Sequence, residues 1–197
     1  MIADSNLNFA RLMDEHVREH LAAVNRLGEQ QNILKTIAAA WMAALKAGNK
    51  ILFFGNGGSA ADAQHLAAEL VVRYRINRRA LPALALTTDT SILTAHSNDF
   101  GFENVFSRQI EALAQPGDVA IGISTSGTSP NILAGLKAAN ERGCVTIAFT
   151  GELESPCSTA AKLSFRAPSA ITARIQECHL LIGHLLCDVI EQSFAAA

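Results

Sequence analysis

Long apolar runs are missing from this sequence of 197 residues. No segment approaches the roughly 20 consecutive apolar residues that a membrane-spanning helix requires. The first 20 residues also lack the basic start and the apolar core of a secretory signal peptide. The sequence therefore predicts a cytoplasmic protein without a membrane partner.

Paired cysteines and excess positive charge are also missing. The four cysteines show no CxxC spacing, so they are typical of small buried hydrophobic residues rather than of a disulfide or zinc framework. The formal net charge is −2, which gives no indication of a nucleic-acid partner. Charged residues make up only 17% of the chain and hydrophobic residues 49%. This composition favours a largely covered sheet or a substantial subunit interface, and the length suits one domain over residues 1–197.

Short apolar segments alternate with segments that can form helices. Residues 1–48 have apolar positions at helical spacing and predict two helices. Five apolar segments then follow as candidate strands, at residues 50–55, 82–88, 117–124, 144–150 and 162–168. This alternation predicts an α/β fold, an open parallel sheet with helices on both faces.

Two candidate strands lead into turns rich in glycine or serine, "GNGGS" and "STSGTS". In sheets of this kind the ligand lies beyond the carboxyl ends of the strands, where both turns fall. In the second turn Ser124, Thr125, Ser126 and Ser129 supply hydroxyl groups, and the turn also has a glycine and a following proline suited to the first position of a helix. Free N–H groups at such a helix start can bind a phosphate. Simple helix capping is the alternative, but one cap needs only one hydroxyl.

The first turn also matches the G-x-G-x-x-A form of a dinucleotide-binding motif. The nearest acidic residue at a second strand end is Asp89, about thirty residues further on, where roughly twenty is expected. We therefore consider a nucleotide-dependent dehydrogenase a weak alternative. The side-chain amide of Asn56 could instead bind a polar ligand directly.

Polar residues recur on one face of the alanine-rich helix after the first turn. Asp62, His65, Glu69 and Arg73 are spaced by three or four residues. His65 and Glu69 could hold a metal ion or divide acid and base chemistry, although such pairs are also common on ordinary surfaces. The C-terminal helix has a similar set among its leucines, namely Gln176, His179 and His184. There, a histidine in the core is the alternative to a ligand.

Four separated motifs resemble those of the sugar isomerase (SIS) domain family. They are "GNGGSAADAQH" with Glu69, "SNDFG", "GDVAIGISTSGTSPN", and "ARIQECH" followed by "GH". Within that family the sequence is similar to the sedoheptulose 7-phosphate isomerases, from about residue 10 to the end. The resemblance implies a flavodoxin-like three-layer αβα sandwich with a central five-stranded parallel sheet, in which residues 1–48 are a helical extension and residues 49–197 the α/β core.

The resemblance also implies an activity. Members form homotetramers with active sites near subunit interfaces, and they convert sedoheptulose 7-phosphate into D-glycero-D-manno-heptose 7-phosphate for bacterial ADP-heptose and lipopolysaccharide core synthesis. We therefore expect an aldose-ketose isomerase that binds a phosphorylated heptose and proceeds through an enediol. One base and one acid suffice for that chemistry.

The site residues that the resemblance implies fall into three groups. The catalytic pair is Glu69, as the base at carbon, and His184. The substrate would contact Asn56, Gly57, Gly58, Glu69, Asn98, Asp99, Ser124, Thr125, Ser126, Ser129 and Gln176. One zinc ion per subunit would be held by His65, Glu69, Gln176 and His184. Gln176 and His184 are roughly 12 Å apart along a straight helix, so both side chains must reach toward a common point.

Two other functions within the same family are possible. One is a non-catalytic phosphosugar-binding protein similar to the initiator-associating factor that binds the replication initiator DnaA, but such proteins typically lack the glutamate and histidine found here at Glu69 and His184. The other is a phosphosugar-sensing regulator, which would ordinarily have a DNA-binding domain. The first 48 residues contain no basic recognition helix.

Overall fold

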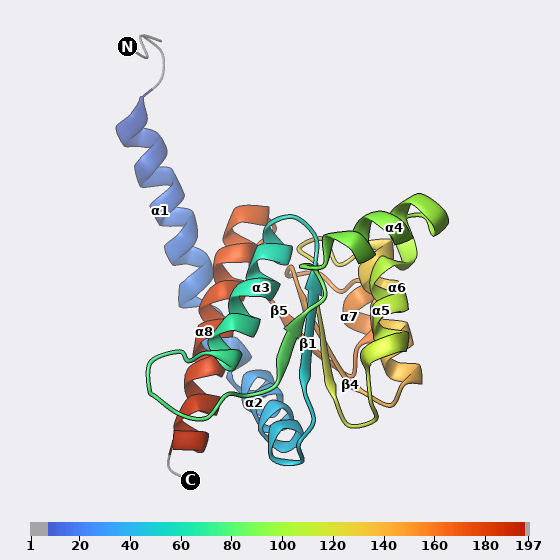
Figure 1. The fold of residues 1–197 in the computed structure, drawn as a ribbon. Helices are drawn as coiled ribbons and strands as arrows, with labels where there is room; N and C mark the ends of the chain where they lie inside the picture. Colours follow the sequence, from blue (N-terminus) through green and yellow to red (C-terminus); the bar gives the residue numbers. More distant parts are fainter. Residues whose placement is uncertain (1–7, 196–197) are drawn as a thin grey trace.

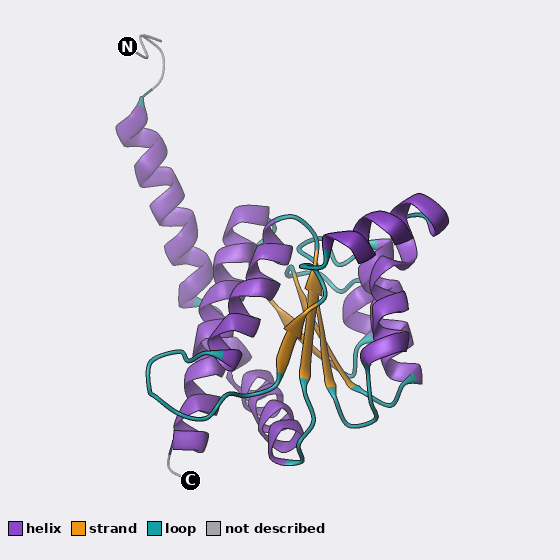
Figure 2. Ribbon diagram, viewed as in Figure 1, coloured by secondary structure: helices purple, strands orange, loops and turns teal. Residues whose placement is uncertain are grey.

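The computed structural model describes residues 8–195 and has the predicted α/β architecture (Figure 1, Figure 2). Five parallel strands form one sheet in the order β2-β1-β3-β4-β5. The strands are β1 (Ile51–Gly55), β2 (Ala83–Ala85), β3 (Val119–Ile123), β4 (Val145–Thr150) and β5 (Leu163–Arg166). Each lies within one of the five predicted segments, so the predicted sheet is confirmed.

Helices cover both faces of the sheet, which explains why β1 and β3 are buried along their whole length. Figure 1 shows α3 and α8 on one side and α5, α6 and α7 on the other. The helices after β1 are α3 (Gly58–Val71), α4 (Thr90–Phe100), α5 (Val105–Leu113), α6 (Pro130–Glu141), α7 (Pro156–Ala160) and α8 (Thr172–Ala195). Each face has its own apolar core, and the larger one lies under α2, α3 and α8.

The predicted N-terminal helices are α1 (Phe9–Asn25) and α2 (Gln31–Lys46), joined by a 3-10 turn at Leu27–Gln30. Helix α2 packs onto the sheet and α8, and Trp41 is fully buried. The N-terminal part of helix α1 instead extends beyond the rest of the molecule (Figure 1), whereas its C-terminal part contacts α8. The larger core includes residues from Ala23 to Ile190, so the N-terminal helices share the core of the α/β part. In the part of the chain that the structure describes, every helix is too short or too polar to span a membrane.

Candidate active site

The two turns predicted to bind ligand lie side by side. Strands β1 and β3 pair in register from Ile51 with Val119 to Gly55 with Ile123, so both strands end at the same level. Asn56 in the first turn and Asn131 at the start of α6 exchange two side-chain hydrogen bonds, each of 2.9 Å. The Asn56 amide, which sequence reasoning assigned to the ligand, therefore links the two turns.

The serine-rich turn forms a compact hydroxyl cluster. The Oγ atoms of Ser124 and Ser129 are 2.9 Å apart, and the Ser126 Oγ accepts hydrogen bonds from the N–H and the hydroxyl of Thr128. Gly127 has φ +66°, and a Cβ there would lie 2.0 Å from the Ser155 Oγ. Only glycine fits this turn, which brings the hydroxyls to the N-terminal end of the 12-residue helix α6.

Helices α3 and α8 run side by side in the same direction, and small residues allow their close approach. A Cβ on Gly58 would lie 2.5 Å from the Gln176 Nε2, and a Cβ on Gly183 would lie 2.5 Å from a methyl of Leu66. The second of these contacts involves the chain neighbours of His65 and His184. This close packing therefore brings the two imidazoles together.

Three predicted side chains meet where α3 and α8 touch. The Nε2 atoms of His65 and His184 are 2.8 Å apart, and the His65 Nε2 is 3.2 Å from a carboxylate oxygen of Glu69. One ligand atom from each of the three residues lies within 4.8 Å of the others. Two imidazole nitrogens and a carboxylate are a donor set that zinc accepts, so the residues present fit a zinc ion.

The environment of His184 favours its neutral form. Burial, and then the neighbouring His65, lower the pKa of His184 below its ordinary value of 6.5, although the Glu69 carboxylate acts in the opposite direction. A neutral imidazole has a free lone pair at neutral pH. It can therefore accept a proton or bind a metal ion.

His179, five residues before His184, lies in the core instead. It is 1% exposed, and its Nε2 donates to the Thr150 carbonyl at 3.0 Å. The rings of Phe149 and Phe165 pack around it. Of the two histidines on the C-terminal helix, His179 therefore belongs to the core and His184 to the three-residue cluster.

Comparison with known proteins identifies the family of this chain. The family model described as the SIS domain matches residues 15–151. This chain belongs to the SIS domain family. It is 54% identical to a phosphoheptose isomerase from Paramagnetospirillum magneticum, over 97% of this chain and 100% of that protein.

Solved structures of similar proteins share the SIS fold. The phosphoheptose isomerase GmhA from Neisseria gonorrhoeae superposes with a TM-score of 0.89 at 41% identity, covering 94% of this chain and 100% of the other. A phosphoheptose isomerase from Francisella tularensis gives a TM-score of 0.91 at 33% identity, with the same coverage.

Other predicted residues of the SIS domain lie outside the three-residue cluster. Asn98 and Asp99 are exposed on α4 and hydrogen-bond to each other at 2.8 Å. Gln176 lies beside Gly58 at the start of α3, roughly 10 Å of helix rise before His65. This position separates Gln176 from the three-residue cluster. The zinc-binding role of Gln176 stays a prediction.

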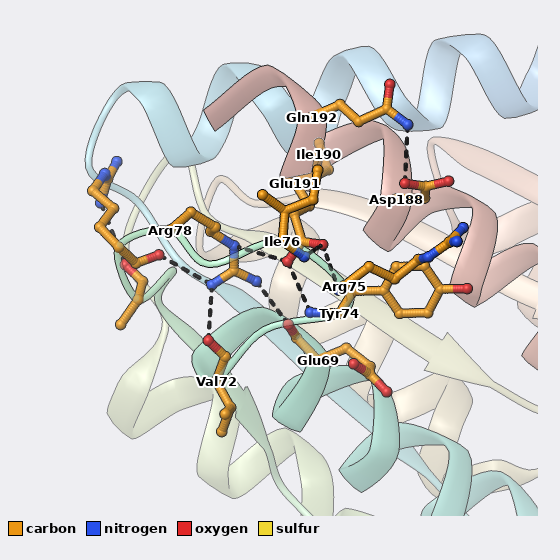
Figure 3. A network of polar contacts seen from close by, with 12 residues as sticks. Glu69, Val72, Tyr74, Arg75, Ile76, Arg78, Asp188, Ile190, Glu191 and Gln192 are labelled. Atoms are coloured by element: carbon orange, nitrogen blue, oxygen red, sulfur yellow. Dashed lines mark hydrogen bonds and ion pairs between the residues drawn. The ribbon is translucent and has the colours of Figure 1, made fainter. Parts of the chain in front are cut away.

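The prediction that Arg73 shares the helical face of Glu69 is wrong, because α3 ends at Val71. Beyond that end the backbone N–H groups of residues 74–76 donate to the Glu191 carboxylate (Figure 3). The sequence pattern does not indicate Tyr74, whose ring stacks on His184 with centroids 5.4 Å apart. No local signal marks the Glu191 contact, because Glu191 stands among other polar residues, Asp188 and Gln192, near the end of the C-terminal helix.

Asp62, the first residue of the predicted polar face, is a partly buried carboxyl. Burial raises its pKa to about 6, against a smaller lowering effect of His65. Within residues 8–195, its Oδ2 has no hydrogen-bond partner. This carboxyl is therefore protonated more readily than an ordinary aspartate.

Proposed function

We propose that this SIS domain protein is a phosphoheptose isomerase that interconverts sedoheptulose 7-phosphate and D-glycero-D-manno-heptose 7-phosphate. The observation that carries the proposal is the meeting of His65, Glu69 and His184 where α3 packs against α8. Relatives with this name match nearly the whole chain. A phosphosugar isomerase needs both an acid-base pair and an anion site.

The acid-base pair performs the proton transfers. Conversion of a 2-ketose into an aldose removes a proton from carbon 1 and adds one at carbon 2, through an enediol. Glu69 is the proposed base at carbon, and its carboxylate is partly shielded from water. His184, with its lowered pKa, is the proposed partner for the second proton transfer.

The serine-rich turn is the proposed phosphate site. Its hydroxyls stand at the N-terminal end of α6, where backbone N–H groups and the helix dipole favour an anion. The proposed phosphate ligands are Ser124, Thr125, Ser126 and Ser129. Asn56, Gly57, Gly58, Asn98, Asp99 and Gln176 are the proposed sugar contacts.

A zinc ion is part of the proposal. His65, Glu69 and His184 would hold it, with Gln176 as the fourth predicted ligand. When bound, zinc supplies Lewis-acid polarisation of the sugar carbonyl or positions its oxygens. The two histidines present their Nε2 atoms to each other, an arrangement that a shared cation stabilises.

Isomerisation can be tested directly. Purified protein is incubated with sedoheptulose 7-phosphate, and aldose formation is followed by NMR, with shorter ketose phosphates as specificity controls. Metal analysis of dialysed protein tests for zinc. No aldose would overturn the proposed activity, and full activity in chelator would overturn a required ion.

We also infer that copies of the chain associate, as the predicted homotetramer requires. Helix α1 has an exposed apolar stripe formed by Phe9, Met13, Val17 and Leu21. A groove of about 1110 Å³ between α2 and α8 is lined mainly by apolar residues, among them Leu181, Leu185 and Val189. Since the N-terminal part of α1 extends beyond its own subunit and the stripe is exposed, the stripe suits the surface of another copy (Figure 1).

The association can be tested with a matched pair of substitutions. Val17→Glu puts a charge in the apolar stripe of α1, whereas Ala22→Glu adds the same charge on the opposite face of that helix. We expect light scattering to give a lower molar mass only for Val17→Glu. An unchanged assembly in Val17→Glu would contradict this interface.

The non-catalytic alternative similar to the DnaA-associating factor makes a different prediction. Such a protein would bind phosphosugars without turnover. The presence of Glu69 and His184 in one cluster favours the enzyme, because a binding protein has no need of a proton-transfer pair.

A further inference from the structure

Segment 72–81 connects α3 with β2 and is fastened to α8 by one carboxylate (Figure 3). The backbone N–H groups of Tyr74, Arg75 and Ile76 donate to Glu191 at 2.8, 2.5 and 2.6 Å. If α3 continued, these groups would bond to carbonyls four residues earlier. The Glu191 carboxylate therefore takes the N–H groups that would extend α3, and it directs the chain toward α8.

The same segment completes the last turn of α3, the turn that contains Glu69. Arg78 donates from Nη2 to the backbone carbonyl of Glu69 at 2.7 Å and from Nη1 to that of Val72 at 3.3 Å. The N–H of Leu81 donates to the Leu70 carbonyl at 3.1 Å. These carbonyls belong to a helix end that lacks intrahelical donors. The backbone position of Glu69 thus depends on Arg78.

An ion pair between Arg78 and Glu191 holds segment 72–81 to α8. The side chains of Arg78 and Glu191 are 1% and 0% exposed, and the Arg78 Nε is 3.5 Å from the Glu191 Oε1. Burial alone would raise the pKa of Glu191, but the three N–H donors and then Arg78 lower it below its ordinary value of 4.5. Glu191 is therefore ionised at neutral pH, and loss of either partner would leave an unpaired buried charge.

Tyr74 connects segment 72–81 to the active site through its contact with His184. Its ring lies nearly parallel to that of His184, with 28° between the planes, whereas His65 meets the His184 ring edge-on at a centroid distance of 5.0 Å. The imidazole is thus held between two rings. Its free rotation about the side-chain bonds is restricted, and its Nε2 stays directed at His65.

We propose that Arg78, Glu191 and Tyr74 are positioning residues of the active site. The buried ion pair fastens segment 72–81 to α8, so that Tyr74 fixes the plane of the His184 ring and Arg78 fixes the helical turn of Glu69. The effect on turnover rests on the proposed isomerase function. The effect on the orientation of His184 does not depend on it.

Tyr74 gives the first test, because the stack requires a ring but no hydroxyl. We expect Tyr74→Leu to lower kcat about tenfold with KM within about twofold, since misplaced proton-transfer groups affect turnover more than binding. In NMR spectra of selectively labelled protein, the ring protons of His184 should shift when the facing ring is lost. Tyr74→Phe should keep both the wild-type kcat and the wild-type position of the His184 signals.

Arg78 gives the second test, with a neighbouring arginine as the control. Arg78→Met and Arg75→Met remove the same charge, but the Arg75 side chain is exposed. We expect Arg78→Met to shift the His184 signals and lower kcat as Tyr74→Leu does, and Arg75→Met to change neither. If Arg78→Met does not fold, the Tyr74 pair decides the question.

Two results would overturn the proposal. One is a Tyr74→Leu protein with wild-type His184 signals. The other is a folded Arg78→Met protein that is less heat-stable but keeps wild-type kcat and His184 signals, which would make the ion pair purely structural. If the wild-type protein shows no isomerase activity, the proposed function fails, whereas the NMR comparison still tests the positioning.

Discussion

His179 and His184 lie on the same helix, α8, but in two contrasting regions. Five residues correspond to about 140° around a helix, so the two imidazoles face different neighbours. His179 points into the core and donates to one backbone carbonyl. His184 faces α3, where His65 and Glu69 surround it.

The contrast separates a buried histidine with one fixed hydrogen bond from a histidine that faces other titratable groups. The single partner of His179, the Thr150 carbonyl, accepts the Nε2 proton and fixes the tautomer. Around His184 the groups compete for the same proton, because its Nε2 faces the Nε2 of His65, which also lies 3.2 Å from Glu69. The same residue type therefore stabilises the fold in one region and is available for chemistry in the other.

The strongest test of this contrast is to remove the reactive pair. Because both groups handle protons in the proposed reaction, Glu69→Gln or His184→Ala should lower turnover by about a hundredfold or more. Circular dichroism and thermal unfolding should show an intact fold. Near-normal turnover in either purified variant would place the chemistry elsewhere.

The buried His179 should instead lower the stability of the protein in acid. Burial, opposed by the hydrogen bond to Thr150, lowers the pKa of His179 from 6.5 to about 4. Its contribution to stability is therefore complete above pH 6.5 and is lost as the pH falls toward 4, because the unfolded chain binds the proton first. The expected loss is about 3 kcal/mol in the free energy of unfolding.

Urea unfolding at pH 7.5 and pH 4.5 measures this loss. His179→Gln is the matched variant, because its amide can still donate to the Thr150 carbonyl but cannot titrate. The variant should lose clearly less stability in acid than the wild-type protein. An equal loss in both would show that other groups cause the acid sensitivity.

The sheet and the serine-rich turn could be predicted because their signals are local. Each strand is a short apolar run bounded by turn residues, and the hydroxyls lie within residues 124–129. The meeting of His65 with His184 could be predicted only through the family resemblance. The two residues are 119 positions apart, and their contact depends on the packing of α3 against α8.

The end of α3 could not be predicted, and Tyr74 was missed for the same reason. The sequence continues with a helical pattern to Arg73, but the N–H groups of residues 74–76 bond to a carboxylate more than a hundred residues away. These N–H groups bond to the distant Glu191 carboxylate instead of to carbonyls of the helix, and no local sequence pattern shows this choice. Physical pairing of distant residues thus decides where Glu69 and the aromatic neighbour of His184 lie.

The packing of the two helices can be weakened at one glycine. Gly183→Ala puts a methyl group 2.5 Å from a methyl group of Leu66, so α3 and α8 must separate or the leucine must move. We expect a cost of about 1–3 kcal/mol in stability and a lower kcat. Adding Leu66→Val should recover part of both. A Gly183→Ala protein with unchanged kcat would show that the contact of the histidines tolerates this shift.

The smallest effect is expected at the serine-rich turn, where several donors would share the proposed phosphate. Ser126→Ala removes one hydroxyl, so we expect a loss of about 1 kcal/mol, or roughly a fivefold rise in KM, with little change in kcat. Ser193→Ala, near the C-terminal end of α8, removes a hydroxyl that bonds within its own helix and should leave KM unchanged. Steady-state kinetics with the heptose phosphate compares the two. An unchanged KM in Ser126→Ala would argue that Ser126 only caps the turn, because a hydroxyl that contacts the phosphate cannot be removed without weakening substrate binding.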